Sequence, residues 1–78
     1  MTEEKNAVTY EITEHIWVIS VNDQTGWKKE LNRVSWSERP PKFDIRDWNP
    51  DHTRSGKGLT LTDDDARALY GIFDNMFA

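Results

Sequence analysis

The chain has 78 residues, no cysteine and a formal net charge of −4. A chain of this length forms one small domain with a thin core, because folding buries only about 60% of its unfolded surface. The absence of cysteine excludes disulfide bonds and thiolate metal sites, so we expect oligomerisation to supply additional stability. No apolar run reaches the roughly 20 residues of a membrane span, and residues 1–5 do not resemble a signal peptide. These features predict a soluble, cytoplasmic protein with no membrane partner.

Charge is distributed unevenly along the chain. Residues 27–58 carry eight basic and five acidic side chains, whereas the remainder carries two basic and nine acidic ones. The position of the cations matters more for nucleic-acid binding than the net charge does. The acidic total therefore does not exclude a nucleic acid as partner.

The hydrophobic pattern predicts four strands and one helix in a single domain over 8–78, after a polar segment, 1–7, that we expect to be flexible. The predicted elements are strands over 8–21, 27–36, 42–48 and 57–61 and a helix over 63–77. A change of alternation phase near Glu14 and His15 predicts a bulge in the first strand. The connections are short enough for an antiparallel meander. The predicted class is therefore α+β, with the order β-β-β-β-α.

The helix has a clear start signal and one apolar stripe. Thr62 is a good N-cap, and Asp65 stands three positions later, as in a capping box. The spacing i, i+3, i+4 then predicts one apolar stripe. Its members are Ala66, Leu69, Tyr70, Phe73, Met76 and Phe77.

The strand over 42–48 predicts a sheet with two different faces. Phe43 and Ile45 point to one face, which the helix or a partner chain would cover. Lys42, Arg46 and Trp48 point to the opposite face, which we expect to stay exposed. Cations beside a flat aromatic ring are typical of proteins that bind a phosphate backbone and stack unpaired bases. The alternative for Trp36 and Trp48 is a position in the core or in a dimer interface.

Other motifs give weaker indications. Gly56-Lys57-Gly58 either lets the backbone approach a phosphate or forms an ordinary turn into a strand. It is not a P-loop, because Asp51 and Gly58 stand where Gly and Ser or Thr are required. The segment starting at Asp47 has the first spacings of a calcium loop, but His52 and Gly58 then occupy the positions of the required Gly and Glu.

No catalytic constellation is visible in the sequence. Asp63–Asp65 is explained by helix capping. His15 and His52 lie far apart in the chain and have no motif around them. We therefore predict a protein that is not an enzyme and has no metal or cofactor. From the residues alone, a single-stranded nucleic acid, either DNA or RNA, and a protein partner for the tryptophans are the alternatives.

Four elements carry a resemblance to a known family. They are D-I-R at 44–46, an aromatic residue at Trp48, G-K-G-L-T-L at 56–61 and T-D-D-D at 62–65. In this order they resemble the transcriptional coactivator family typified by positive cofactor four, in particular its short bacterial members. The resemblance covers residues 27–77. The turn at 37–41 and the segment 15–21 depart from the family pattern.

The resemblance implies a homodimer in which each chain forms a four-stranded curved antiparallel sheet followed by one helix. The helices and first strands would build the dimer core, and the sheets would bind single-stranded DNA with little sequence preference. By position, Arg46 and Lys57 match cations that contact the DNA backbone, and Trp48 matches an aromatic cluster. A coactivator role implies contact with the transcription machinery, and a bacterial member would associate with the nucleoid.

Two sets of residues are therefore predicted to carry the function. The predicted nucleic-acid-binding residues are Lys28, Lys29, Arg33, Trp36, Lys42, Arg46, Trp48, Arg54 and Lys57. The predicted dimer-interface residues are Leu69, Tyr70, Phe73, Met76 and Phe77.

Overall fold

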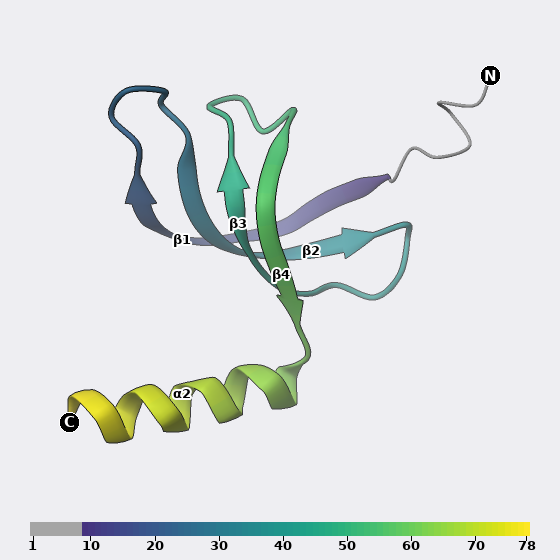
Figure 1. Cartoon of the computed structure of the whole chain (residues 1–78). Coiled ribbons are helices and arrows are strands. Elements are labelled where there is room, and N and C mark those ends of the chain that lie inside the picture. The colour runs from purple at the N-terminus through teal and green to yellow at the C-terminus, as the bar shows by residue number, and fades with distance from the viewer. Residues whose placement is uncertain (1–8) are drawn as a thin grey trace.

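The computed structural model describes residues 9–78, so the predicted flexible segment 1–7 lies outside the described residues. The elements are β1 (Tyr10–Val21), β2 (Lys28–Trp36), β3 (Lys42–Trp48), β4 (Ser55–Leu61) and the helix α2 (Asp63–Phe77). The strands form one antiparallel sheet in the order β1-β2-β3-β4 (Figure 1). The predicted β-β-β-β-α order is confirmed, with β4 beginning two residues before the predicted start at Lys57.

The sheet is strongly bent, and the bend follows from bulges in β1. Twelve residues of β1 run beside nine of β2, with register shifts between Ile12 and Glu14, between His15 and Trp17, and between Val18 and Ser20. Each bulge bends its strand and increases the local twist. The predicted bulge near residues 14 and 15 is thus one of three.

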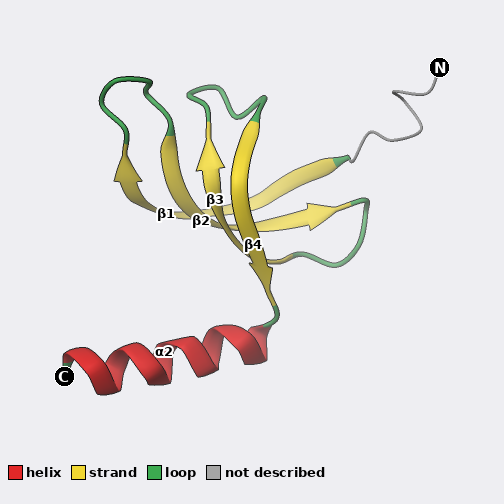
Figure 2. Cartoon of the chain, viewed as in Figure 1, coloured by secondary structure: helices red, strands yellow, loops and turns green. Residues whose placement is uncertain are grey.

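Helix α2 begins with the predicted capping box. The backbone N–H of Asp65 donates to the Thr62 hydroxyl at 3.0 Å, and the Thr62 N–H donates to the Asp65 carboxylate at 3.3 Å. A short loop joins the helix to β4, and α2 lies apart from the sheet (Figure 2). No residue of α2 is buried. No helix within residues 9–78 combines the length and apolar character needed to cross a membrane.

The two faces of the sheet differ in burial. The face that carries Trp48, here called the Trp48 face, includes Val34 and Trp48, both 0% exposed, and three buried polar residues. These polar residues are Glu30, Asn32 and Asp44. The opposite face, here called the Phe43 face, carries Phe43, Ile45, Leu59 and Leu61, which are all at least partly exposed.

The expectation that the Trp48 face stays exposed is therefore wrong for the single chain. The predicted parity of β3 is right, but the buried side chains lie on the Trp48 face and not on the Phe43 face. The sheet bends so that Tyr10 of β1 and the β3–β4 loop cover Trp48. Helix α2 does not bury the Phe43 face, because Leu59 remains 51% exposed.

Two glycines provide a matched test of this packing. A Cβ on Gly58 would clash with the Cβ of Arg46 and with the Ile45 carbonyl oxygen, whereas a Cβ on Gly71 meets nothing within 4 Å. We expect Gly58→Ala to lower the free energy of unfolding by about 1–3 kcal/mol or more, because overpacking forces the strands apart. Gly71→Ala, on the solvent side of α2, should raise it by about 0.5–1 kcal/mol. Chemical denaturation of both variants checks this, and a tolerated Gly58→Ala would contradict the close pairing of β3 and β4.

Candidate nucleic-acid interface

The Trp48 face is organised around the carboxylate of Asp44, which is 0% exposed. Its oxygens accept hydrogen bonds from the Trp36 indole N–H at 3.2 Å and from the Thr60 hydroxyl at 3.1 Å. They also accept two hydrogen bonds from the Arg46 guanidinium, at 2.8 and 3.0 Å. Residues of β2, β3 and β4 are therefore joined at one buried anion, which is fully satisfied by its partners.

Arg46 holds the aromatic side of this network in place. Its third nitrogen donates to the Gly56 carbonyl oxygen at 3.4 Å, and its guanidinium carbon lies 4.8 Å from the centre of the Trp36 ring. Only 17% of the Arg46 side chain is exposed. The predicted contact between Arg46 and phosphate stays a prediction, but the geometry makes Arg46 a positioning group for Trp36.

Trp48 lies beneath two other rings. The centre of its ring is 5.2 Å from that of Tyr10 and 5.7 Å from that of His52. The Tyr10 hydroxyl donates to the His52 carbonyl oxygen at 2.5 Å, which ties β1 to the β3–β4 loop. The indole N–H of Trp48 is buried without an acceptor in the described part of the chain. A ring that is 0% exposed offers no surface to a base, so Trp48 is a core residue of this structure.

An aromatic and basic pocket lies at the β2–β3 end of the same face. It has a volume of about 270 Å³ and is lined by Trp36, Arg39, Lys42 and Thr60, together with Val34 and Pro40. Arg39 and Lys42 are exposed, whereas Trp36 is half-buried. The structure thus brings together two predicted residues, Trp36 and Lys42, and adds Arg39. We call these three residues the Trp36 pocket.

The turn between β2 and β3 positions Arg39. Ser37 and Glu38 have φ angles of 52° and 63°, and the Arg39 N–H donates to the Trp36 carbonyl oxygen at 3.0 Å. These values are typical of a type I′ turn, which usually contains Asn and Gly. The Ser35 hydroxyl also donates to the Arg39 carbonyl oxygen at 2.6 Å. Sequence analysis missed Arg39 because Ser37 and Glu38 give no signal for such a turn.

The other predicted cations are spread over the molecule. Lys29 pairs with Asp47 at 3.3 Å, and Arg33 lies between Glu14 and Asp63, at 3.6 Å from each, with its guanidinium 4.0 Å from the Phe43 ring centre. Those two cations belong to the Phe43 face. The remaining cations are exposed and form no ion pair within residues 9–78. They are Lys28, Arg54 and Lys57.

The Gly56-Lys57-Gly58 motif has a packing explanation. Gly58 lets β4 approach Arg46. A Cβ added to Gly56 would lie 3.5 Å from the Trp27 ring. Packing therefore requires glycine at position 58, whereas a Cβ at position 56 would make only ordinary van der Waals contacts. Lys57 between them is exposed and remains available to an anion.

The structure also assembles a group that the sequence did not reveal. His15, Glu30 and His52 converge beside β1, although they lie far apart in the chain. The loop that carries His52 is ordered by Asp51, whose carboxylate accepts hydrogen bonds from the Thr53 hydroxyl at 2.7 Å and from its backbone N–H. These bonds lower the pKa of the Asp51 carboxyl.

Comparison with known proteins agrees with the motifs and the topology. The model of the family described as Transcriptional Coactivator p15 (PC4) matches residues 24–72. The chain belongs to the PC4 family. A protein of Treponema pallidum (strain Nichols), described as an uncharacterized protein, is 42% identical over 67 residues, which cover 86% of this chain and 78% of that protein. The PC4 match includes β2, β3, β4 and most of α2 and therefore contains the whole Trp36 pocket.

Membership of the PC4 family confirms the predicted resemblance. It indicates a coactivator-like, nucleic-acid-binding function rather than catalysis. The PC4 match leaves out all of β1, the strand that contains the segment 15–21 whose sequence departs from the family pattern.

The burial of Trp48 changes the expected effect of its substitution. We expect Trp48→Ala to lower the free energy of unfolding by about 3–5 kcal/mol, since it removes a large buried ring. Trp48→Phe should cost less, because it keeps an aromatic ring and removes a buried N–H whose lack of an acceptor costs about 1–3 kcal/mol. Urea unfolding followed by circular dichroism measures both. If the Trp48→Ala variant were as stable as the wild type, the Trp48 ring would not be part of the core.

Proposed function

We propose that this PC4-family protein binds single-stranded DNA with little sequence specificity and that it acts as a homodimer in transcription or in protecting exposed single strands. The observation that carries the proposal is the Trp36 pocket. In it one indole ring, held by Asp44 and Arg46, adjoins the exposed cations Arg39 and Lys42. A ring can stack any base, and neighbouring cations attract the phosphates on either side of it.

The position of the ring supports this proposal. The indole N–H of Trp36 is bound to a buried carboxylate, and Arg46 lies against the ring, so the indole is fixed before a ligand arrives. A fixed ring loses little conformational freedom when a base stacks on it, which favours binding. Lys57 on β4 and Arg54 in the β3–β4 loop are further exposed cations.

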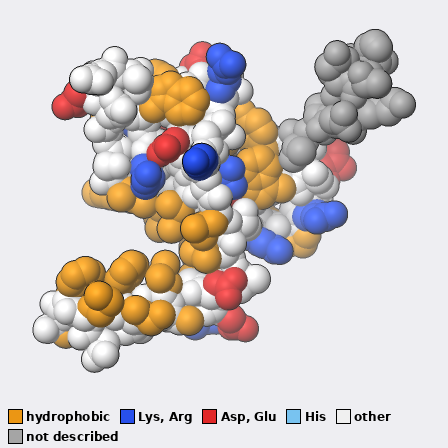
Figure 3. Space-filling view, viewed as in Figure 1, with side chains coloured by type: hydrophobic (Ala, Val, Ile, Leu, Met, Phe, Trp, Pro, Cys, Tyr) orange, Lys and Arg blue, Asp and Glu red, His pale blue; other side chains and the backbone are white. Residues whose placement is uncertain are grey.

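The apolar surface of the chain supports a second copy as partner. In α2 the predicted interface residues Tyr70, Phe73, Met76 and Phe77 are 71%, 46%, 66% and 78% exposed. Hydrophobic side chains gather in a row along the side of α2 that faces the sheet (Figure 3). A 15-residue helix without packing is marginally stable in water, so this stripe requires a cover. Apolar residues of β1, led by Trp17 at 77%, are exposed as well.

The DNA proposal is tested by titrating the protein with a thymine oligomer of about 20 nucleotides at several salt concentrations, followed by tryptophan fluorescence. We expect Arg39→Ala/Lys42→Ala to make the slope of log K against log salt shallower by about 1.4, at about 0.7 per lost phosphate contact. Arg67→Ala is the matched control, because Arg67 is an exposed cation on α2, away from the Trp36 pocket.

Three results would contradict the DNA proposal. They are an unchanged slope in the double variant, an equal effect of Arg67→Ala, or equal affinity for RNA of the same length. Equal affinity would show that the site does not discriminate DNA from RNA, and higher affinity for RNA would favour single-stranded RNA as the ligand. A salt-independent interaction with a polypeptide would favour the protein-partner alternative.

The homodimer is tested by sedimentation equilibrium of two helix variants. We expect Phe73→Glu to convert the dimer to monomer, because it places a charge in the apolar stripe of α2. Asn75→Glu introduces the same side chain on the opposite side of the helix and should leave the dimer unchanged. A monomeric wild-type protein, or dissociation by both substitutions, would contradict this use of α2.

A further inference from the structure

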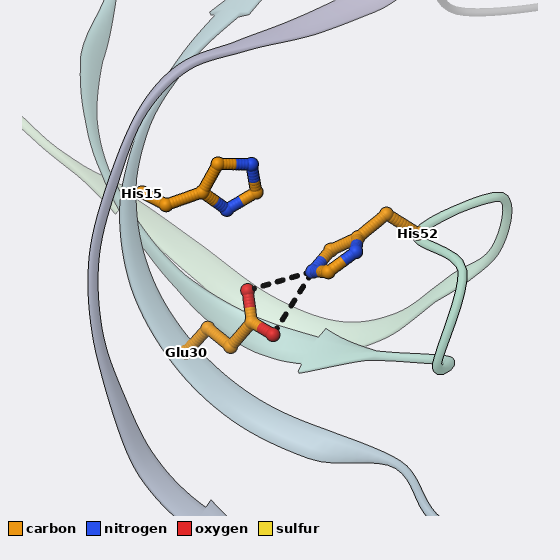
Figure 4. Close-up of side chains that lie close together, drawn as sticks. All are labelled: His15, Glu30 and His52. Carbon is orange, nitrogen blue, oxygen red and sulfur yellow. Dashed lines mark hydrogen bonds and ion pairs between the residues drawn. The ribbon is translucent and has the colours of Figure 1, made fainter.

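Two histidines and one glutamate meet beside the bend of the sheet. His15 comes from β1, Glu30 from β2 and His52 from the β3–β4 loop, and their side chains point toward one another (Figure 4). The Nε2 atom of His52 lies 3.0 and 2.9 Å from the two carboxylate oxygens of Glu30. One ligand atom from each of the three residues lies within 4.8 Å of the other two.

Glu30 is the unusual member of this group. It is 4% exposed, and within residues 9–78 its carboxylate has only the Asn32 amide, at 2.9 Å, and His52 as hydrogen-bond partners. A buried ionised carboxylate is costly unless a cation compensates it. No lysine or arginine is paired with Glu30 in the described residues, although Lys28 lines the edge of the same pocket. The exposed Lys28 side chain is free to turn toward solvent.

The three side chains are also held by neighbouring groups. His52 has a φ of 61°, a left-handed conformation that is uncommon for a residue other than glycine, and its N–H donates to the Asn49 carbonyl oxygen at 3.0 Å. Asn32 donates to Glu30 and accepts from the Ile16 N–H at 3.3 Å, beside His15. Such outer contacts orient metal ligands in proteins, and their removal lowers the metal affinity about 10–100-fold.

We propose that His15, Glu30 and His52 bind a divalent transition-metal ion of the Zn²⁺ type. Two imidazoles and one carboxylate are a common ligand set for such ions, with water in the remaining position. The group opens into a pocket of about 540 Å³, which leaves space for that water. The proposal concerns a site separate from the Trp36 pocket and does not rest on nucleic-acid binding.

The geometry requires only a small adjustment. Ligand atoms around a tetrahedral ion stand about 3.3 Å apart, given bonds of about 2.0–2.1 Å, so the widest pair must close by roughly 1.5 Å. His15 is exposed and can supply this movement by rotation of its side chain. The hydrogen bond between His52 and Glu30 is exchanged for two bonds to the ion. The bound metal then joins β1 to the β3–β4 loop and neutralises the buried carboxylate.

The test uses the full-length, untagged protein and Zn²⁺ alone, with binding measured by calorimetry and by NMR of the imidazole side chains. His15 and His52 are the two histidines of the chain, so imidazole signals report directly on them. We expect one ion per chain, shifts of both imidazoles, and a loss of affinity of at least about tenfold in His15→Ala, His52→Ala and Glu30→Gln. Asp74→Asn, which removes an exposed carboxylate on α2, away from the three ligands, should bind as the wild type does.

His15→Ala decides the proposal, because His15 is exposed and its loss should not affect folding. Circular dichroism of each variant confirms that it is folded. The absence of saturable Zn²⁺ binding up to millimolar concentration would overturn the proposal. Binding that His15→Ala leaves unchanged would overturn it equally, since the ion would then be held elsewhere.

Discussion

The structure depends on one buried anion. The Asp44 carboxylate accepts hydrogen bonds from an indole, a guanidinium and a hydroxyl that belong to three successive strands. These partners give it the compensation that a charge needs in a dry environment. They also decide where Trp36 and Arg46 lie, and thereby fix one wall of the pocket that we propose for DNA. A polar contact, rather than an apolar core, therefore sets the geometry of this face.

That arrangement suits a chain that is too small to bury much apolar surface. Val34 and Trp48 are the buried hydrophobic residues within 9–78, whereas eleven large apolar residues of the same range are exposed. Most of the expected hydrophobic stabilisation is thus absent from the single chain. A homodimer would bury the stripe of α2 and part of β1, so folding and association would be closely coupled. The polar network of Asp44 would then supply specificity to each half, while the partner would supply apolar contacts.

Local sequence signals predicted the elements well. Thr62 and Asp65 predicted the start of α2, because capping depends on residues three apart in the chain. Alternation in 42–48 predicted which residues of β3 share a face, since successive side chains in a strand point in opposite directions. Neither signal depends on the rest of the fold, and both were confirmed.

The same alternation could not tell which face is buried. Trp48 is covered by Tyr10, 38 positions earlier, and by the loop that carries His52. The direction in which the sheet bends decides this, and the bend comes from bulges in β1 that the sequence located only in part. His15, Glu30 and His52 were missed for a related reason: they meet through strand pairing and loop folding rather than through spacing. Arg39 was missed because its turn uses Ser37 and Glu38 in conformations that other residues adopt more easily.

The unequal lengths of β1 and β2 have a further consequence. Where two paired strands differ by three residues, the longer strand must follow the outer arc. The curvature is therefore fixed by the lengths of the strands and not by a ligand. A sheet of this kind cannot flatten without breaking its own hydrogen bonds. The curvature is therefore built into the pairing of β1 with β2, and a strand or second subunit that fits against the sheet would follow that shape.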